Sequence, residues 1–111
     1  MTTLSTHVLD TTHGKPAAGM AVVLVGARGE IARGVTNNDG RCPGLAPGEL
    51  TPGRYALRFA VADYFRAAGV ALADPPFLDE VTIDFGVAAD GGHYHVPLLV
   101  SPYGYSTYRG S

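Results

Sequence analysis

The chain has 111 residues, with eight lysines and arginines against ten aspartates and glutamates, so it is long enough for one domain and carries a net charge of −2. This near-neutral balance argues against a basic surface for nucleic acid or anionic lipid, and no apolar run approaches the roughly 20 residues of a membrane span. The first residues lack the charged and apolar regions of a signal peptide, and the single cysteine, Cys42, rules out an intrachain disulfide, so we expect a soluble cytoplasmic protein.

Fifteen glycines and eight prolines predict many turns and therefore short strands. Residues 11–16 have the composition of a turn, and residues 37–40, Asn-Asn-Asp-Gly, give the strongest turn signal because these residue types tolerate positive φ. A further short strand is considered near residues 48–50, inside the loop 43–52. Alternating polar and apolar side chains, or β-branched runs, predict strands over residues 4–10, 20–25, 30–36, 53–61, 79–87, 93–100 and 103–108.

One short helix is expected among these strands, over the alanine-rich residues 63–69, with Gly69 as its C-cap. Seven or eight short strands separated by regular turns predict an all-β fold, a Greek-key β-sandwich. Pro97 falls inside a predicted strand. Because proline donates no ladder hydrogen bond, we expect it at an edge or a bulge.

The last predicted strand, residues 103–108, lacks the features that protect the edge of a sheet. It contains no lysine, no carboxylate and no internal proline, and such an edge is a template for pairing. We therefore predict that this strand pairs with its copy in another subunit and forms a dimer with a continuous sheet.

The histidines raise the question of a metal site. His93 and His95 stand two apart, so a strand would place both imidazoles on one face, with His7 or His13 as a third ligand. The sequence has neither a cysteine cluster nor a helical HExxH pattern, and a His-x-His pair in a strand is more often one surface residue and one packed residue. The metal site is therefore the weaker hypothesis, and we expect none.

The same groups suit hydrolysis without a metal. A neutral imidazole can take a proton from water, and His7 and His95 are candidates because each lies in a predicted strand. Arg41 and Arg109 could stabilise the oxyanion that forms when water adds to a carbonyl. Hydroxyls that could hold a polar substrate lie near the end of the sequence, on Ser106, Thr107, Tyr108 and Ser111.

Each of these residues also has a simpler explanation when it is taken alone. Arg41 after Asp-Gly would stabilise a turn, and Tyr108 would only pack. Cys42 beside Arg41 offers another chemistry, because a neighbouring cation lowers the pKa of a thiol and produces a nucleophile. A lone cysteine is more often a small core residue, so this alternative carries less weight.

Several segments taken together resemble one known family. They are residues 4–11 (LSTHVLDT), 14–17 (GKPA), 36–41 (TNNDGR), 64–65 (YF), 76–77 (PF), 93–99 (HYHVPLL) and 108–111 (YRGS). They resemble the 5-hydroxyisourate hydrolases, the transthyretin-related enzymes of urate breakdown. The resemblance covers nearly the whole chain, 1–111, as a single domain. The final Tyr-Arg-Gly-Ser is its most specific element, because it separates these enzymes from transthyretin, the hormone carrier of the same fold.

The resemblance implies a transthyretin-like sandwich that assembles as a homotetramer, two dimers back to back, with active sites in the cleft between the dimers. It implies hydrolysis of 5-hydroxyisourate to 2-oxo-4-hydroxy-4-carboxy-5-ureidoimidazoline, without a metal or a cofactor. The family's functional positions correspond here to the catalytic residues His7, Arg41 and His95 and to the substrate-binding residues Tyr108, Arg109, Gly110 and Ser111.

On this hypothesis the two histidines flank the substrate ring and one of them, with His7 preferred, activates water while Arg41 stabilises the oxyanion. Two other classes of function remain open. A carrier would hold a small aromatic ligand in the channel between dimers without reaction, and would suit a mostly apolar pocket. A purely structural adhesion-type sandwich would leave the crowded terminal residues without an explanation.

Overall fold

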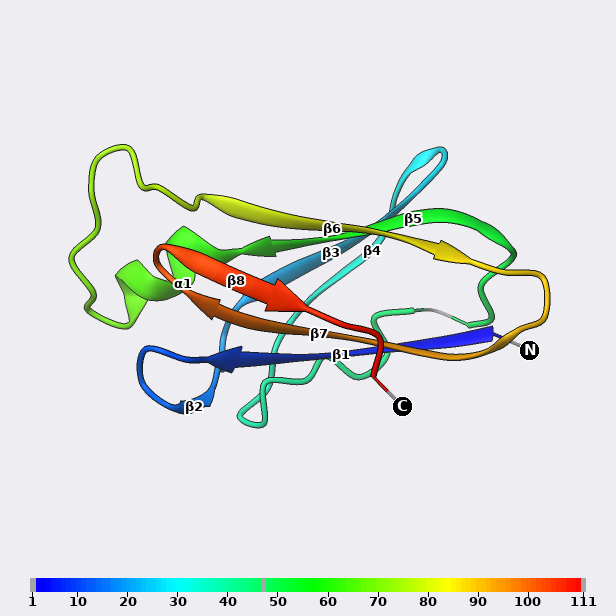
Figure 1. Cartoon of the computed structure of the whole chain (residues 1–111), viewed down its shortest axis with the longest axis horizontal. Coiled ribbons are helices and arrows are strands. Elements are labelled where there is room, and N and C mark those ends of the chain that lie inside the picture. The colour runs from blue at the N-terminus through cyan, green and yellow to red at the C-terminus, as the bar shows by residue number, and fades with distance from the viewer. Residues whose placement is uncertain (1, 47, 111) are drawn as a thin grey trace.

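Two four-stranded sheets face one another in the computed structural model, which describes residues 2–46 and 48–110 (Figure 1). The strand orders are β2-β1-β7-β8 and β4-β3-β5-β6. The strands are β1 (Thr2–Asp10), β2 (Lys15–Pro16), β3 (Ala21–Gly26), β4 (Gly29–Val35), β5 (Gly53–Ala60), β6 (Glu80–Val87), β7 (Gly92–Ser101) and β8 (Gly104–Thr107). The one helix of the described residues is α1 (Val61–Ala67). The predicted all-β sandwich is confirmed.

The core lies between the sheets and is built from the inward side of each alternating strand. Leu24, Leu57 and Phe59 of one sheet are fully buried, as are Val8 and Leu98 of the other. The outward positions of β5 include the exposed residues Arg54 and Arg58, so one register buries Leu57 and Phe59 and keeps these charges in solvent. The alternation predicted for the strands therefore corresponds to real inward and outward faces.

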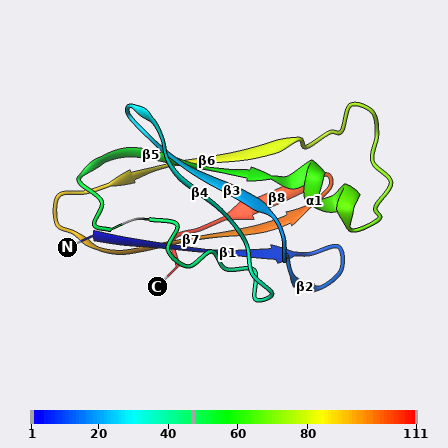
Figure 2. The same cartoon turned by 180° about the vertical axis from the view of Figure 1, so that it is seen from behind.

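Strand β1 pairs with β7 in parallel along its whole length, from Thr2 beside Gly92 to Asp10 beside Val100. The two views from opposite sides both show these strands side by side in the middle of their sheet (Figures 1 and 2). A parallel pair needs a long crossover connection, and here the rest of the sandwich supplies it. The pairing therefore sets residues near the beginning of the chain against residues near its end.

The helix begins two residues earlier than predicted, at Val61 rather than Asp63, and β5 ends at Ala60. Val61 is fully buried, and a buried residue at that position fits the alternation of a strand as well as the apolar face of a helix. Gly69 has φ of +84° and follows the C-cap residue Ala68, which fits its expected role in ending the helix. Within the described residues no helix is long and apolar enough to cross a membrane.

Three smaller predictions about strands were wrong. Residues 48–50 form no strand, whereas Lys15 and Pro16, predicted as turn, form the short strand β2 against Leu9 and Asp10. Strand β8 covers Gly104–Thr107 rather than 103–108. Tyr103 belongs to the turn from β7, and residue 108 lies where the β7–β8 ladder is interrupted.

Pro97 lies in β7, which has neighbours on both sides and no register shift at this residue, so the prediction of an edge or a bulge was wrong. The physical reason for its tolerance is local. The ladder with β8 stops at the pair Leu98–Thr107, and its register resumes only at His95–Gly110. Beside this gap, the hydroxyl of Thr107 donates to the Pro97 carbonyl at 2.8 Å. The missing N–H therefore coincides with a gap in the ladder.

The exposed edge of the first sheet is β8, as the sequence suggested. All four of its residues are exposed, and Tyr103 and Tyr105 at its start are 66% and 49% exposed. Pairing of this edge with a second copy stays a prediction, because the structure is that of a single chain.

A buried carboxylate joins the end of β1 to the helix. The Tyr64 hydroxyl donates to Asp10 Oδ2 at 2.7 Å, and the His13 backbone N–H donates to Asp10 Oδ1 at 3.0 Å. Burial would raise the pKa of Asp10, but its hydrogen bonds to His13 and Tyr64 outweigh that effect and hold the pKa below 3.8. The ionised carboxylate therefore stabilises the end of the sheet on which the site depends.

Substitution of Tyr64→Phe is expected to lower the free energy of unfolding at pH 7 by about 1.5–3 kcal/mol, the usual range for a hydrogen bond to a charged group. The native pKa of Asp10 is lowered, so this stabilisation is present above pH 3.8 and is lost as pH falls through the native pKa. Urea unfolding at several pH values measures the difference. Tyr55→Phe is the control, because the Tyr55 hydroxyl donates to Thr51 O in an exposed position. Equal effects for the two variants would contradict this role of Asp10.

Candidate active site

The outward face of the β1–β7 pair carries a row of polar side chains. Paired residues of neighbouring strands share a face, so the register places Ser5 beside His95 and Thr3 beside His93. Ser5 Oγ lies 2.7 Å from His95 Nδ1 and 2.8 Å from His93 Nε2. The expectation that both imidazoles of the His-x-His pair share one face is therefore confirmed.

Arg41 is brought to this face by the turn at residues 37–40. The Asn37 side-chain oxygen accepts hydrogen bonds from the backbone N–H groups of Asp39 and Arg41, and Arg41 forms an isolated antiparallel bridge with His7. Gly40 has φ of +75°, and a Cβ there would lie 2.3 Å from the Val8 carbonyl oxygen. Only glycine allows this close approach, so the turn docks Arg41 directly onto β1.

The last described residue packs against the second histidine. The Gly110 N–H donates to the His95 carbonyl at 2.8 Å, which forms an isolated bridge between them. A Cβ at position 110 would lie 2.4 Å from His95 Cδ2. The bare backbone of Gly110 therefore covers the imidazole, and any side chain there would displace the ring.

The surroundings of His95 alter its ionisation. Burial lowers its pKa below 6.5, and the charges of Arg41, His7 and His93 lower the pKa further. Its imidazole is therefore neutral at neutral pH and can accept a proton. Ser5 engages Nδ1, and no hydrogen bond within the described residues uses Nε2. A neutral, half-buried imidazole with one nitrogen held and the other unengaged is suited to act on a bound molecule.

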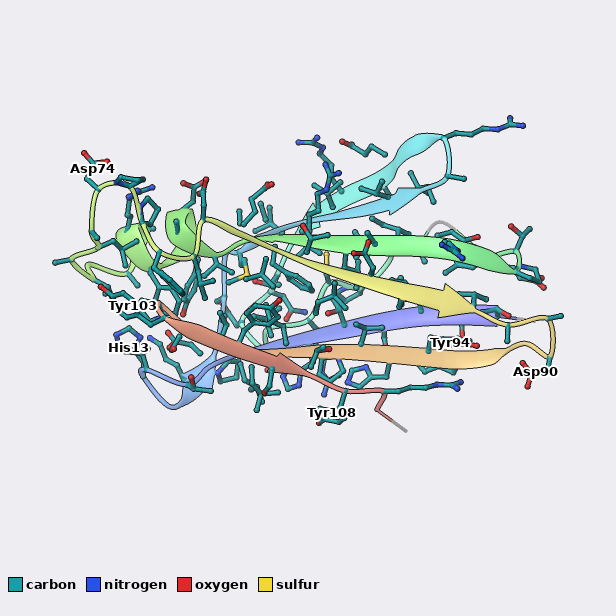
Figure 3. The ribbon with its side chains drawn as sticks, turned by 45° about the horizontal axis from the view of Figure 1, so that its top comes forward. His13, Asp74, Asp90, Tyr94, Tyr103 and Tyr108 are labelled. Carbon is teal, nitrogen blue, oxygen red and sulfur yellow. The ribbon has the colours of Figure 1, made fainter. Side chains whose placement is uncertain are left out.

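The structure separates the remaining candidates. Tyr108 is 60% exposed and projects from the outer side of the sheet in Figure 3. Arg109 lies on the other side, with its guanidinium 4.0 Å from the centre of the Tyr94 ring and Nη2 3.5 Å from the His93 carbonyl. It borders an open cleft of about 250 Å³ between β6 and the chain after β8. Ser111 lies outside the described residues. The roles predicted for these residues stay predictions.

Two alternatives from the sequence lose their support. Cys42 is a core residue whose sulfur would lie 2.6 Å from a Cβ at Gly34, and burial raises the pKa of its thiol, so it is not the activated nucleophile considered earlier. His13 lies in the turn after β1, where its ring is hydrogen-bonded to Asp10, and Figure 3 shows it at the same end of the molecule as Tyr103. Within residues 2–46 and 48–110, no group of three His, Cys, Asp or Glu side chains is arranged to hold a metal ion.

Sequence reasoning assigned no role in hydrolysis to Ser5 or His93, although both are hydrogen-bonded into the site. His93 was considered only as a metal ligand, and Ser5 only as part of a predicted strand. The signal that reveals them is the parallel register of β1 and β7, which pairs residues some 90 positions apart. No local pattern in the sequence encodes that register.

Comparison with known proteins decides the family. A model of the HIUase/Transthyretin family matches residues 4–110. The chain belongs to this family. Among curated relatives, the 5-hydroxyisourate hydrolase of Ralstonia nicotianae is 56% identical over 114 aligned residues, which cover 97% of both chains. The family resemblance noted in the sequence is therefore confirmed.

Solved structures of the family have the same fold. The 5-hydroxyisourate hydrolase of Klebsiella pneumoniae is 39% identical with a TM-score of 0.87, over 99% of this chain and 100% of that one. An (S)-allantoin synthase is 41% identical with a TM-score of 0.90, over 98% of this chain, but this chain spans only 43% of its length. Sea bream transthyretin in complex with thyroxine is 30% identical with a TM-score of 0.85, over 96% of this chain and 93% of that one. The family thus includes both proteins named as enzymes and a ligand-binding protein.

Substitution of Gly110→Ala is expected to reduce turnover about 100-fold, the usual cost of moving a catalytic group by about 1 Å. The methyl group would overlap His95 Cδ2 and push the imidazole from its position. Steady-state kinetics measures the loss, and the urea midpoint checks that the fold is intact. Gly86→Ala is the matched control, since a Cβ there meets nothing within 4 Å. Full activity of the Gly110 variant would show that this contact does not position His95.

Proposed function

We propose that this chain hydrolyses 5-hydroxyisourate to 2-oxo-4-hydroxy-4-carboxy-5-ureidoimidazoline, as part of urate breakdown, without a metal or a cofactor. The support is twofold: relatives 52–56% identical over nearly the whole chain are named 5-hydroxyisourate hydrolases, and His7, Arg41 and His95 converge on one face. The observation that carries the proposal is the convergence, because a carrier of an apolar ligand needs no neutral imidazole beside a guanidinium.

The chemistry assigned to each residue follows from its surroundings. Water attacks a ring carbonyl while His95 Nε2 takes one of its protons, and Arg41 stabilises the oxyanion that forms. The tetrahedral carbon then releases the ring nitrogen, which receives the proton back from Nε2, so that a C–N bond breaks and a carboxyl group forms. The lowered pKa of His95 supports giving it the base role that sequence reasoning preferred for His7. His7, bridged to Arg41, then helps to hold the substrate.

We also propose that the working unit is a homotetramer, a dimer of dimers. The face that carries His7 and His95 is an open sheet surface. A surface hollow of about 430 Å³ lies elsewhere, beside Lys15 and Tyr64, and contains none of the candidate residues. An open face excludes water poorly, whereas hydrolysis by a positioned base benefits from enclosure. A second copy laid against this face would close the site, with the segment 108–110 as part of its wall. A cytoplasmic location stays a prediction.

Freshly generated 5-hydroxyisourate, followed by absorbance with and without the protein, tests the activity. The protein is expected to accelerate decay well above the spontaneous rate. Substitution of His95→Asn or His7→Asn should lower kcat, for His95 by about 10²- to 10⁴-fold, the usual contribution of a positioned base. Light scattering serves as the control that both variants keep the mass of the wild-type assembly. Absence of any acceleration would favour a ligand carrier.

The pH dependence provides a second test with a defined sign. The neutral form of His95 is the active one, so kcat/KM is expected to fall as pH drops through its pKa, which lies below 6.5. Arg41→Gln removes a positive charge that lowers this pKa, so the acid limb and the NMR titration of His95 should both move to higher pH.

The control for this shift is Arg33→Gln, since Arg33 pairs with Glu30 on the other sheet. It should leave the His95 titration in place. A titration of His95 that does not move in the Arg41 variant would remove the electrostatic part of the proposal.

A further inference from the structure

Four side chains on the outer face of β1 and β7 form a continuous hydrogen-bonded chain. Thr3 Oγ1 lies 2.6 Å from His93 Nδ1, His93 Nε2 lies 2.8 Å from Ser5 Oγ, and Ser5 Oγ lies 2.7 Å from His95 Nδ1. Both ring nitrogens of His93 are therefore engaged. The parallel register sets Thr3 beside His93 and Ser5 beside His95, so the chain zigzags between the two strands.

Hydrogen counting couples the two imidazoles. A serine hydroxyl has one hydrogen to donate, and a neutral imidazole has one N–H and one acceptor nitrogen. If Ser5 donates to His93 Nε2, it accepts from His95, and the proton of His95 lies on Nδ1. If Ser5 donates to His95 Nδ1, the proton of His95 lies on Nε2 and that nitrogen cannot accept another. Only the first direction leaves His95 with a free lone pair on Nε2.

We propose that Ser5 and His93, with Thr3 at the far end, are positioning residues that hold His95 with its proton on Nδ1 and its Nε2 free to accept. This inference rests on the proposed function, since it gives His95 the role of base. In the chain, His95 donates from Nδ1 to Ser5, Ser5 donates to His93 Nε2, and His93 donates from Nδ1 to Thr3. When His95 gains a proton at Nε2, its Nδ1–H keeps the same acceptor, so no partner has to reorient.

The charges around this chain favour the arrangement. His7 of β1, Arg41 of the docked turn and His93 of β7 all disfavour a cationic His95, and the Arg109 guanidinium lies 3.5 Å from the His93 carbonyl. A hydroxyl that accepts from Nδ1 is then the group through which β1 stabilises the imidazolium during reaction. Ser5 can accept from His95 in this way only if it donates to an unprotonated Nε2 of His93. A His93 protonated at Nε2 would donate to Ser5 instead.

Nitrogen-15 NMR of the full-length protein, at a pH where His95 is neutral, reports directly which ring nitrogen carries the proton. The wild type is expected to show the proton on Nδ1. Ser5→Ala should lose this preference and lower kcat about tenfold or more, with a smaller change in KM. The upper limit of the loss is the roughly 10²- to 10⁴-fold contribution of a positioned base. Ser5→Thr keeps the hydroxyl and should retain both the tautomer and most of kcat.

A second pair of variants keeps the test decisive if Ser5→Ala does not fold. The amide oxygen of His93→Gln can still accept from Ser5, so this variant should keep the Nδ1–H tautomer, whereas His93→Leu should lose it. A wild-type His95 protonated on Nε2, or an unchanged tautomer and kcat in Ser5→Ala or His93→Leu, would overturn the inference. A wild-type protein that does not hydrolyse 5-hydroxyisourate would refute the proposed function, and the NMR result would still decide whether the chain sets the tautomer.

Discussion

The parallel pairing of β1 with β7 is the constraint on which the rest of the site depends. It sets residues 2–10 against residues 92–100 in a single unbroken register. A shift of one residue would turn Ser5 and His7 toward the core and break the bonds to His93 and His95. Because the inward neighbours Thr6, Val8, Val96 and Leu98 are all buried, the hydrophobic core itself enforces the register that the polar face requires.

Close backbone contact, rather than side-chain recognition, brings the remaining groups to this face. At Gly40 and Gly110 the main chain approaches Val8 and His95 more closely than any Cβ would permit. The first contact delivers Arg41 and the second covers the imidazole of His95. Glycine costs conformational entropy in the folded state, so its placement at these two points reflects a geometric requirement of the site. Gly34 does the equivalent for the core, where it makes room for the buried sulfur of Cys42.

The electrostatics of the face suit proton transfer better than storage of an apolar ligand. A guanidinium and two further imidazoles surround His95, and together with burial they keep it neutral. The same positive groups would stabilise negative charge that develops on a substrate oxygen. This chain shares its fold with sea bream transthyretin. Its outer face carries polar groups that the binding of an apolar ligand alone does not require.

Local pattern was enough to predict the sandwich, most strand positions and the shared face of His93 and His95, since alternation and turn chemistry act over a few residues. It misplaced the start of the helix, missed β2 and put Pro97 at an edge or a bulge, because each of those depends on what packs or pairs alongside. Residue chemistry suggested His7, His95, Arg41 and Arg109 for hydrolysis, and the resemblance to a family then reduced the catalytic set to His7, Arg41 and His95, which spacing could not. Only the tertiary structure decided that Ser5 bridges the two histidines, that Arg109 turns toward Tyr94 and that Cys42 is inert, because strand register and burial are set by contacts between residues far apart in the chain.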